Sequence, residues 1–419
     1  MSPRPFTAVD LLSFPEEESA RLFRTIAEKR HSGEWDYPIP TSGDFATMTP
    51  DDVVHWLHKA EAPVRRAVRD SGLERYFQLQ VPLSLPDGFT STDQLTLAAA
   101  GDLMDHDDLP RSGSTLYPAI ASMLFGADIC TANLECIVTN DRRTLHIKTS
   151  EAPILTFRKG SFKSAIEHAG RAFTFVSTAC NHSLDCGVPG LRSTQDALDA
   201  LGVAYHGTYR DEAASRRARI VECRGFRVGM ISHTFGLNGH VPPPDQPWVV
   251  SRTHLNGAVG EVDLTQLSAQ LAHCRAEGVD FVIGHLHWGL EHEFYPRPTQ
   301  LELAHHLAEL GLDLIIGHHP HVLQPVEHYR TRRDPNRVVP IYYSLGNLVN
   351  PFAHPAFRVG GIAQLSLARG HRNGVTSTYV QSTQLTEVFQ EHDAEHETLR
   401  IVVANDEQRS VLPWMSSKE

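Results

Sequence analysis

Two histidines separated by a single residue are the feature of this sequence with the clearest chemical meaning. His319-Pro320-His321 comes shortly after the apolar run 312–316, which is typical of a buried β-strand that ends in glycine. Ligands of α/β sheets bind at the carboxyl ends of the strands. Two neutral imidazoles one residue apart can bind the same metal ion. The motif therefore indicates a metal site at a strand end.

Similar polar side chains follow other apolar runs along the chain. They are Asp102 after 95–100, Glu135 after 127–132, Asn181 and His182 after 173–178, and His285 and His287 after 280–283. Each alone also fits a structural role: a turn aspartate, a surface glutamate, a helix cap or a core histidine. Together they favour a divalent cation that accepts both oxygen and nitrogen ligands, such as Ca, Mn, Zn or Fe.

Helical patterns separate the apolar runs, so the chain alternates between strands and helices. The helices are expected at 189–201, 262–277 and 299–310, and later strands at 338–343, 361–367 and 375–381. This alternation predicts an α/β fold with mostly parallel sheets and helices on their outer faces. In such a fold the polar residues at the strand ends meet along one edge.

Residues 1–94 do not follow this alternation and are predicted to form a mostly helical extension in front of a domain at 95–419. Helices are expected at 15–29 and 49–71, the second with Thr49 as its N-cap, and 82–93 resembles a linker. An appendage that only stabilises the domain and one that takes part in the chemistry are both compatible with this pattern.

Composition narrows the class of protein. The 419 residues carry a net charge of -12, which argues against nucleic-acid binding. The six cysteines form no C-x-x-C pair and predict reduced thiols in a cytoplasmic protein, although a reactive thiol at Cys180 or Cys186 stays open. Neither a targeting segment nor a membrane-spanning run is apparent, so no membrane partner is expected. The oligomeric state does not follow from the sequence.

The polar motifs, taken in order, resemble the poly-γ-glutamate capsule-synthesis (CapA-like) family. The resemblance covers about residues 95–385. The motifs are Gly101-Asp102, Asn133-Leu134-Glu135, Asn181-His182-Ser183-Leu184-Asp185-Cys186-Gly187, His287-Trp288-Gly289, Gly317-His318-His319-Pro320-His321 and Tyr343-Ser344-Leu345-Gly346-Asn347. The resemblance implies the calcineurin-like metallophosphoesterase fold, a four-layer α-β-β-α sandwich of two mixed sheets.

The resemblance also implies roles for individual residues. The metal centre would be lined by Asp102, Glu135, Asn181, His287, His319 and His321. His182 would occupy the place of a catalytic histidine, with Asp185 to orient it and raise its basicity. Ser344 and Asn347 would help to shape the floor of the pocket.

One departure from the fold's usual pattern concerns the number of metal ions. Phosphoesterases of this fold usually begin with Asp-x-His, whereas the position two after Asp102 is Met104. A thioether is a poor ligand for a hard divalent ion, so one ion is expected instead of two. His106, which stands among several aspartates, is a candidate base.

These features, with a resemblance to a soluble lasso-peptide epimerase of the family, predict a metal-dependent isomerase. It would invert Cα of the C-terminal residue of a ribosomal precursor peptide that has a free carboxylate. Inversion needs one acid/base group on each face of Cα. His182 with Asp185 is one candidate; the other is His106, or His285 with His287 near Glu291. The alternatives are a hydrolase of phosphoesters or γ-glutamyl amides, and an accessory protein for polymer assembly.

Overall fold

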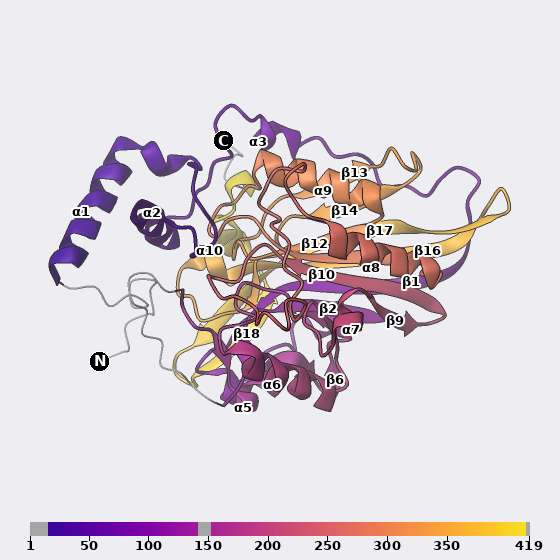
Figure 1. Ribbon diagram of the computed structural model, residues 1–419, viewed down its shortest axis with the longest axis horizontal. Helices are drawn as coiled ribbons and strands as arrows, with labels where there is room; N and C mark the ends of the chain where they lie inside the picture. The colour runs from indigo at the N-terminus through magenta and orange to yellow at the C-terminus, as the bar shows by residue number, and fades with distance from the viewer. Residues whose placement is uncertain (1–15, 141–151, 416–419) are drawn as a thin grey trace.

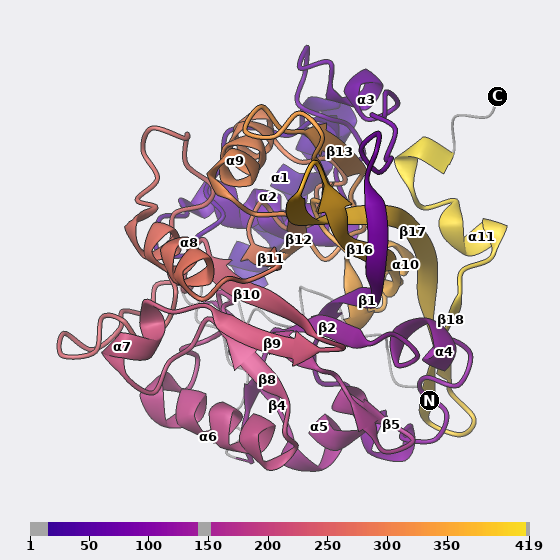
Figure 2. The same cartoon turned by 90° about the vertical axis from the view of Figure 1, so that its right-hand side faces the viewer.

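Two β-sheets stacked face to face, with helices on both outer faces, form the body of the protein. The computed structural model describes residues 16–140 and 152–415 (Figures 1 and 2). The predicted four-layer α/β sandwich of two mixed sheets is confirmed. Residues 1–15, which include the start of the helix expected at 15–29 and much of the region searched for a targeting signal, lie outside the described part.

The first sheet combines a parallel half and an antiparallel half. Its strands are β1 (Thr90–Leu103), β2 (Ile129–Leu134), β7 (Phe175–Ser177), β8 (Ala204–His206), β15 (Asn347–Val349), β16 (Val359–Arg372), β17 (Val375–Asp393) and β18 (Thr398–Val403). The order is β18-β17-β16-β1-β2-β7-β8, and β15 pairs with β1. Strands β1, β2, β7 and β8 run parallel, whereas β16 to β18 form an antiparallel meander.

The second sheet is parallel at its centre and antiparallel at both edges. Its strands are β9 (Arg219–Cys223), β10 (Phe226–Thr234), β11 (Phe281–His287), β12 (Leu314–His318), β13 (Val326–Arg330) and β14 (Val338–Tyr342). The order is β13-β14-β12-β11-β10-β9, with β9 and β13 antiparallel to their neighbours. The mostly parallel arrangement expected from the sequence is therefore found in one half of the first sheet and at the centre of the second.

Alternating side chains of the strands build the layers, because successive residues point to opposite faces of a sheet. Leu97 and Ala99 of β1 pack in the core between the two sheets, whereas Ala98 and Ala100 face outward. The outer face of the first sheet is covered by α5 (Lys159–Ile166) and α6 (Gly187–Ala200). The outer face of the second is covered by α8 (Thr265–Ala276) and α9 (Pro298–Leu310).

The remaining elements are short. They are η2 (Glu34–Asp36), α3 (Leu73–Tyr76), η3 (Leu109–Arg111), α4 (Ala121–Leu124), β3 (Ile137–Val138), β4 (Thr156–Phe157), β5 (Glu167–His168), β6 (Arg171–Ala172), α7 (Glu212–Ser215), α10 (Pro355–Arg358), α11 (Asp406–Arg409) and η4 (Pro413–Met415). In the described part of the chain no helix combines the length and the apolar character needed to cross a membrane.

The N-terminal extension contains two longer helices, α1 (Glu16–Ser32) and α2 (Pro50–Glu61), at one end of the molecule (Figure 1). Thr49 caps α2 in a capping box with Asp52, as its sequence predicts. The predicted end of this helix at residue 71 is wrong, because Pro63 drives Ala62 out of the α conformation. The linker expected at 82–93 is also too long, since β1 begins at Thr90.

Candidate metal centre

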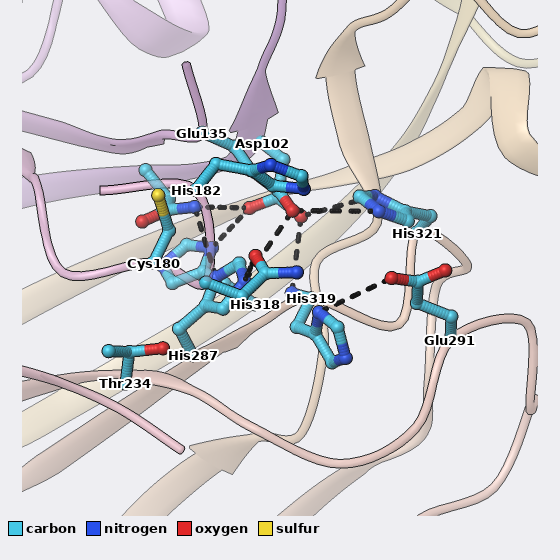
Figure 3. A network of polar contacts seen from close by, with 12 residues as sticks. Asp102, Glu135, Cys180, His182, Thr234, His287, Glu291, His318, His319 and His321 are labelled. Atoms are coloured by element: carbon cyan, nitrogen blue, oxygen red, sulfur yellow. Dashed lines mark hydrogen bonds and ion pairs between the residues drawn. The ribbon is translucent and has the colours of Figure 1, made fainter. Parts of the chain in front are cut away.

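Side chains from both sheets converge where the carboxyl ends of β1, β2, β11 and β12 meet. Asp102 belongs to β1, Glu135 follows β2, and His287 ends β11. His319 and His321 follow β12, and Figure 3 shows all five side chains gathered around one centre. The two sheets thus each supply part of the site.

Glycines before two of the ligands allow this convergence. A Cβ on Gly101 would lie 2.0 Å from the carbonyl oxygen of Gly346, and a Cβ on Gly317 would lie 1.9 Å from that of Tyr343. Both positions therefore require glycine, because the neighbouring backbone occupies the space of a side chain. The close approach brings Asp102 and the histidines after β12 to the same edge.

The ligands form two overlapping sets that share one carboxylate. One set is Glu135, His287 and His319, the other is Asp102, Glu135 and His321, and within each set the ligand atoms lie within 4.8 Å of one another. Oε1 of Glu135 is 3.5 Å from Nε2 of His287 and 3.6 Å from Nε2 of His321. Glu135 therefore lies between the sets.

Asn181 completes the first set. Its Oδ1 lies 2.9 Å from Nε2 of His287, so both atoms face the same point. All the residues predicted to line the metal centre are therefore brought together.

The buried polar atoms of this cluster fit a cation. Both carboxylate oxygens of Glu135 and both ring nitrogens of His319 are buried and have no hydrogen-bond partner within the described residues. Burial, and then the carboxylate of Asp102, raise the pKa of Glu135 well above its usual value. Burial lowers the pKa of His287 and His319, which keeps both imidazoles neutral and able to bind a metal. A divalent cation would satisfy all these groups.

Hydrogen bonds around the cluster fix the orientation of His321. Nδ2 of Asn347 donates to the backbone carbonyls of His321, at 3.2 Å, and Phe357, at 2.9 Å. Its Oδ1 is therefore the atom that faces Nδ1 of His321, at 3.0 Å, and accepts that N–H. This leaves the lone pair of Nε2 directed at Glu135. Asn347, which was expected to shape the pocket floor, thus orients a ligand.

Asp102 is held by two hydrogen bonds and an ion-pair contact that the sequence did not identify individually. Nδ2 of Asn133 donates to Oδ1 of Asp102 at 2.9 Å, and the backbone N–H of His319 donates to Oδ2 at 3.2 Å. Nδ1 of His318 makes an ion-pair contact with Oδ1 at 3.1 Å. Burial would raise the pKa of Asp102, but His318 and the other nearby imidazoles lower it below its usual range. Asn133 and His318 lie within the sequence motifs quoted above, and nothing else in the sequence pointed to a role for them.

The backbone is strained at two of the proposed metal ligands. His319 has φ 98° and His321 has φ 57°, both in the region that favours glycine. Each such conformation costs about 1–3 kcal/mol and is retained mainly at functional sites. Met104, by contrast, packs in the apolar core on the outer side of the first sheet and takes no part in either set.

His182 and Asp185 form a buried pair next to the cluster, as the sequence predicts. Nδ1 of His182 is 2.8 Å from Oδ2 of Asp185, which also accepts the backbone N–H of Leu155 at 2.6 Å. A carboxylate can only accept, so Nδ1 carries the proton, and Nε2 is the unprotonated nitrogen, which lies 3.5 Å from Nδ2 of Asn238. His182 is close enough to His287 and His319 for its charge to lower the pKa of both.

Two other predicted bases are not placed at the cluster. His285 is completely buried beneath it, with Nδ1 3.2 Å from Nε2 of His318. His106 belongs to a separate polar group with Asp108 and His392. Burial also raises the pKa of the Cys180 thiol to about 12, which disfavours the reactive thiolate considered for that position.

Comparisons with known proteins agree with this geometry. A sequence model of the family described as bacterial capsule synthesis protein PGA_cap matches residues 96–351, which contain every ligand above but not the N-terminal extension. The PGA biosynthesis protein CapA of Bacillus subtilis is 25% identical over 276 residues, which cover 62% of this chain and 64% of that protein.

Two further relatives show the same level of similarity. The capsule biosynthesis protein CapA of Bacillus anthracis is 27% identical over 263 residues, which cover 61% of this chain and 60% of that protein. A probable polyglutamine synthesis accessory protein of Mycobacterium tuberculosis is 27% identical over 242 residues, which cover 55% of this chain and 59% of that protein. The chain spans less than two thirds of the length of each of these relatives.

Proposed function

Because this chain belongs to the PGA_cap family of bacterial capsule synthesis proteins, we propose that it is a metal-dependent hydrolase of an amide bond in poly-γ-glutamate or a similar peptidic substrate. The observation that carries this proposal is Glu135, a buried carboxylate without a hydrogen-bond partner that lies between two sets of ligands. The substrate class comes from the relatives, whose names refer to PGA biosynthesis, capsule biosynthesis and polyglutamine synthesis.

The residues of the cluster have distinct parts in this proposal. The ion or ions would be held by Asp102, Glu135, Asn181, His287, His319 and His321. A divalent ion at such a site polarises a carbonyl oxygen and lowers the pKa of a water molecule. Two overlapping sets, neither of which includes Met104, would allow a second ion beside the one expected from the sequence.

His182 would supply the proton that the leaving group needs. When water adds to the carbonyl carbon, the C–N bond breaks and the amine nitrogen must take up a proton. Nε2 of His182 can take up the proton that the attacking water releases and then donate it to the amine nitrogen, because Asp185 holds the ring through Nδ1. Asp185 is then a positioning residue.

An amide is favoured over a phosphoester by the charges around the cluster. Sites that transfer phosphoryl groups usually clamp the phosphate oxygens with lysine or arginine. Within the described residues, the ion pairs of the cluster involve only histidines and carboxylates. Lys59 of α2 is paired with Glu293 at 2.9 Å, and Arg297 contacts the same carboxylate.

The proposal is tested by hydrolysis of γ-glutamyl oligomers by the full chain loaded with Mn²⁺, Zn²⁺, Fe²⁺ or Ca²⁺. Released amines are measured by chromatography. Glu135→Gln and His182→Asn should lose turnover, whereas the exposed controls Glu395→Gln and His371→Asn should keep it. Absence of amine release with every metal would overturn the proposal.

Peptide epimerisation is the second candidate, and the His182–Asp185 pair is the observation that favours it. This candidate lacks a second acid/base group at the cluster, since His285 is buried and His106 lies in another polar group. An epimerase would incorporate one deuteron at Cα from heavy water and leave a peptide with a free C-terminal carboxylate intact. A hydrolase would split the substrate, and an accessory protein would do neither.

A further inference from the structure

A small pocket lies between the N-terminal extension and the metal cluster. Its volume is about 10 Å³, which is room for about one water-sized group. The extension supplies most of its wall, namely Thr41, Ser42, Gly43, Met48, Asp52, Trp56 and Lys59. The opposite wall is formed by Leu290 and Glu291, from the connection between β11 and α9, and by the proposed metal ligand His319. Figure 3 shows Glu291 next to His319, on the side away from His182.

Buried contacts attach the extension to the domain at this point. Nζ of Lys59 is 2.9 Å from Oε1 of Glu293, and the two side chains are 4% and 1% exposed. The backbone N–H of Val64 donates to the carbonyl of His292 at 2.9 Å, and that of Phe294 donates to the carbonyl of Val64 at 3.0 Å. The wall formed by α2 is therefore a fixed part of the site.

The pocket has an uncompensated negative charge. Lys59, its one lysine, shares the carboxylate of Glu293 with Arg297, so these three groups together carry one positive charge, against the two negative charges of Asp52 and Glu291. The carboxylate of Glu291 accepts the indole N–H of Trp56, and its ion-pair contacts within the described residues are only with the imidazoles of His319 and His292. Asp52 accepts from the hydroxyl groups of Thr41 and Thr49 and the backbone N–H of Thr49. A cation that enters the pocket would meet the carboxylates of Asp52 and Glu291 beside the indole of Trp56.

We propose that this pocket binds the primary ammonium group at the amino-terminal end of the substrate, with Glu291 as its counter-ion and Trp56 as its aromatic wall. The adjoining amide then passes His319 into the metal cluster. The inference rests on the proposed function and makes it more specific, because it restricts the substrate to peptidic or γ-glutamyl compounds with a free amino terminus.

The size of the pocket supports recognition of a chain end. A cavity of about 10 Å³ is far below the roughly 300–1,000 Å³ that is usual for drug-sized ligands. Room for a single ammonium group suits the end of a chain, whereas an internal stretch would need an open groove on both sides. The hydroxyls of Thr41 and Ser42, which are half-buried, can accept the remaining ammonium protons.

The test compares two probes that differ only at the amino group. γ-L-Glutamyl-L-glutamate and its N-acetyl derivative are titrated calorimetrically into the Mn²⁺-loaded full chain carrying His182→Asn, which suppresses turnover. We expect the free amine to bind at least about tenfold tighter. Adding Glu291→Gln should remove most of this preference, whereas adding Asp51→Asn, an exposed carboxylate on the same helix as Asp52, should leave it unchanged. Metal content is measured for each protein.

The ratio of the two dissociation constants decides the outcome, because a general loss of metal or folding affects both probes alike. Equal binding of the two probes by the His182→Asn protein would overturn the inference, and so would a preference that survives Glu291→Gln. Equal hydrolysis of both compounds by the native chain would refute amine recognition and leave the proposed function intact. Selective binding of the free amine without any hydrolysis would support the pocket and refute the hydrolase.

Discussion

Glu135→Gln should have opposite effects on stability with and without metal, because Glu135 is a buried carboxylate without a hydrogen-bond partner. In the metal-free protein its pKa is raised by burial and by Asp102. A raised pKa means that the folded state holds the proton more tightly than the unfolded state does. The stability that this shift contributes is fully present below the pKa of the unfolded state, about 4.3. It is lost as the pH rises through the pKa of the folded state.

The size of the effect follows from this linkage. Each unit by which folding raises the pKa of Glu135 destabilises the folded state by about 1.4 kcal/mol, at a pH above the pKa of the folded state. A chain of 419 residues shifts its melting temperature by roughly 1 °C for each kcal/mol, because its unfolding entropy is about 0.9 kcal/mol/K. Glutamine has nearly the same shape and no charge, so the metal-free Glu135→Gln protein should melt several degrees above the wild type at high pH. With metal at 100 times Kd, the wild type gains about 2.7 kcal/mol that the variant largely loses.

The assay is thermal melting in EDTA and in Mn²⁺ across pH 5 to 8. His287 and His319 also have shifted pKa values, but both proteins share these groups, so the difference between the two melting curves isolates Glu135. We expect the variant to be the more stable protein in EDTA and the less stable one in Mn²⁺. A variant that melts below the wild type in EDTA at pH 8 would show that Glu135 is stabilised without a cation. Glu395→Gln, an exposed change of the same kind, is the control.

Three further predictions test other parts of the structure. His182→Asn should lower turnover by about 10²- to 10⁴-fold with metal content unchanged, and normal turnover would exclude a role in proton transfer. Asn347→Ala should weaken metal binding by roughly 10- to 100-fold in competition with a chelator, because it frees the ring of His321; unaltered affinity would contradict this. Lys59→Met should cost about 1.5–3 kcal/mol in denaturant unfolding, because the buried Glu293 loses its 2.9 Å contact with Lys59 and keeps only Arg297; a loss below 1 kcal/mol would contradict a fixed extension.

The identity of the ligands could be predicted because each is encoded beside its own strand. The apolar runs before Asp102, Glu135 and His287 correspond to β1, β2 and β11, and the helices between them form within a few residues of the predicted positions. Periodicity and chain order are local properties, and a parallel α/β arrangement carries all these strand ends to one edge.

Predictions from local sequence patterns were incomplete where contacts with distant parts of the chain decide the position of a side chain. His285 looked equivalent to His287 in sequence, yet a two-residue offset along β11 places it beneath the cluster against His318. Asn347 is more than twenty residues from His321 in sequence, and only the pairing of β15 with β1 brings its amide to that imidazole.

The sequence by itself therefore determined the fold class, the edge of the sheets that binds metal and the chemical nature of the ligands, because all of these follow from short-range periodicity and residue type. Only the tertiary structure decided that Glu135 is shared by two ligand sets and that the extension closes a pocket beside His319. Both features depend on long-range packing: the stacking of two sheets in one case, and a buried contact between Lys59 and Glu293 in the other. No pattern within a single segment contains either arrangement.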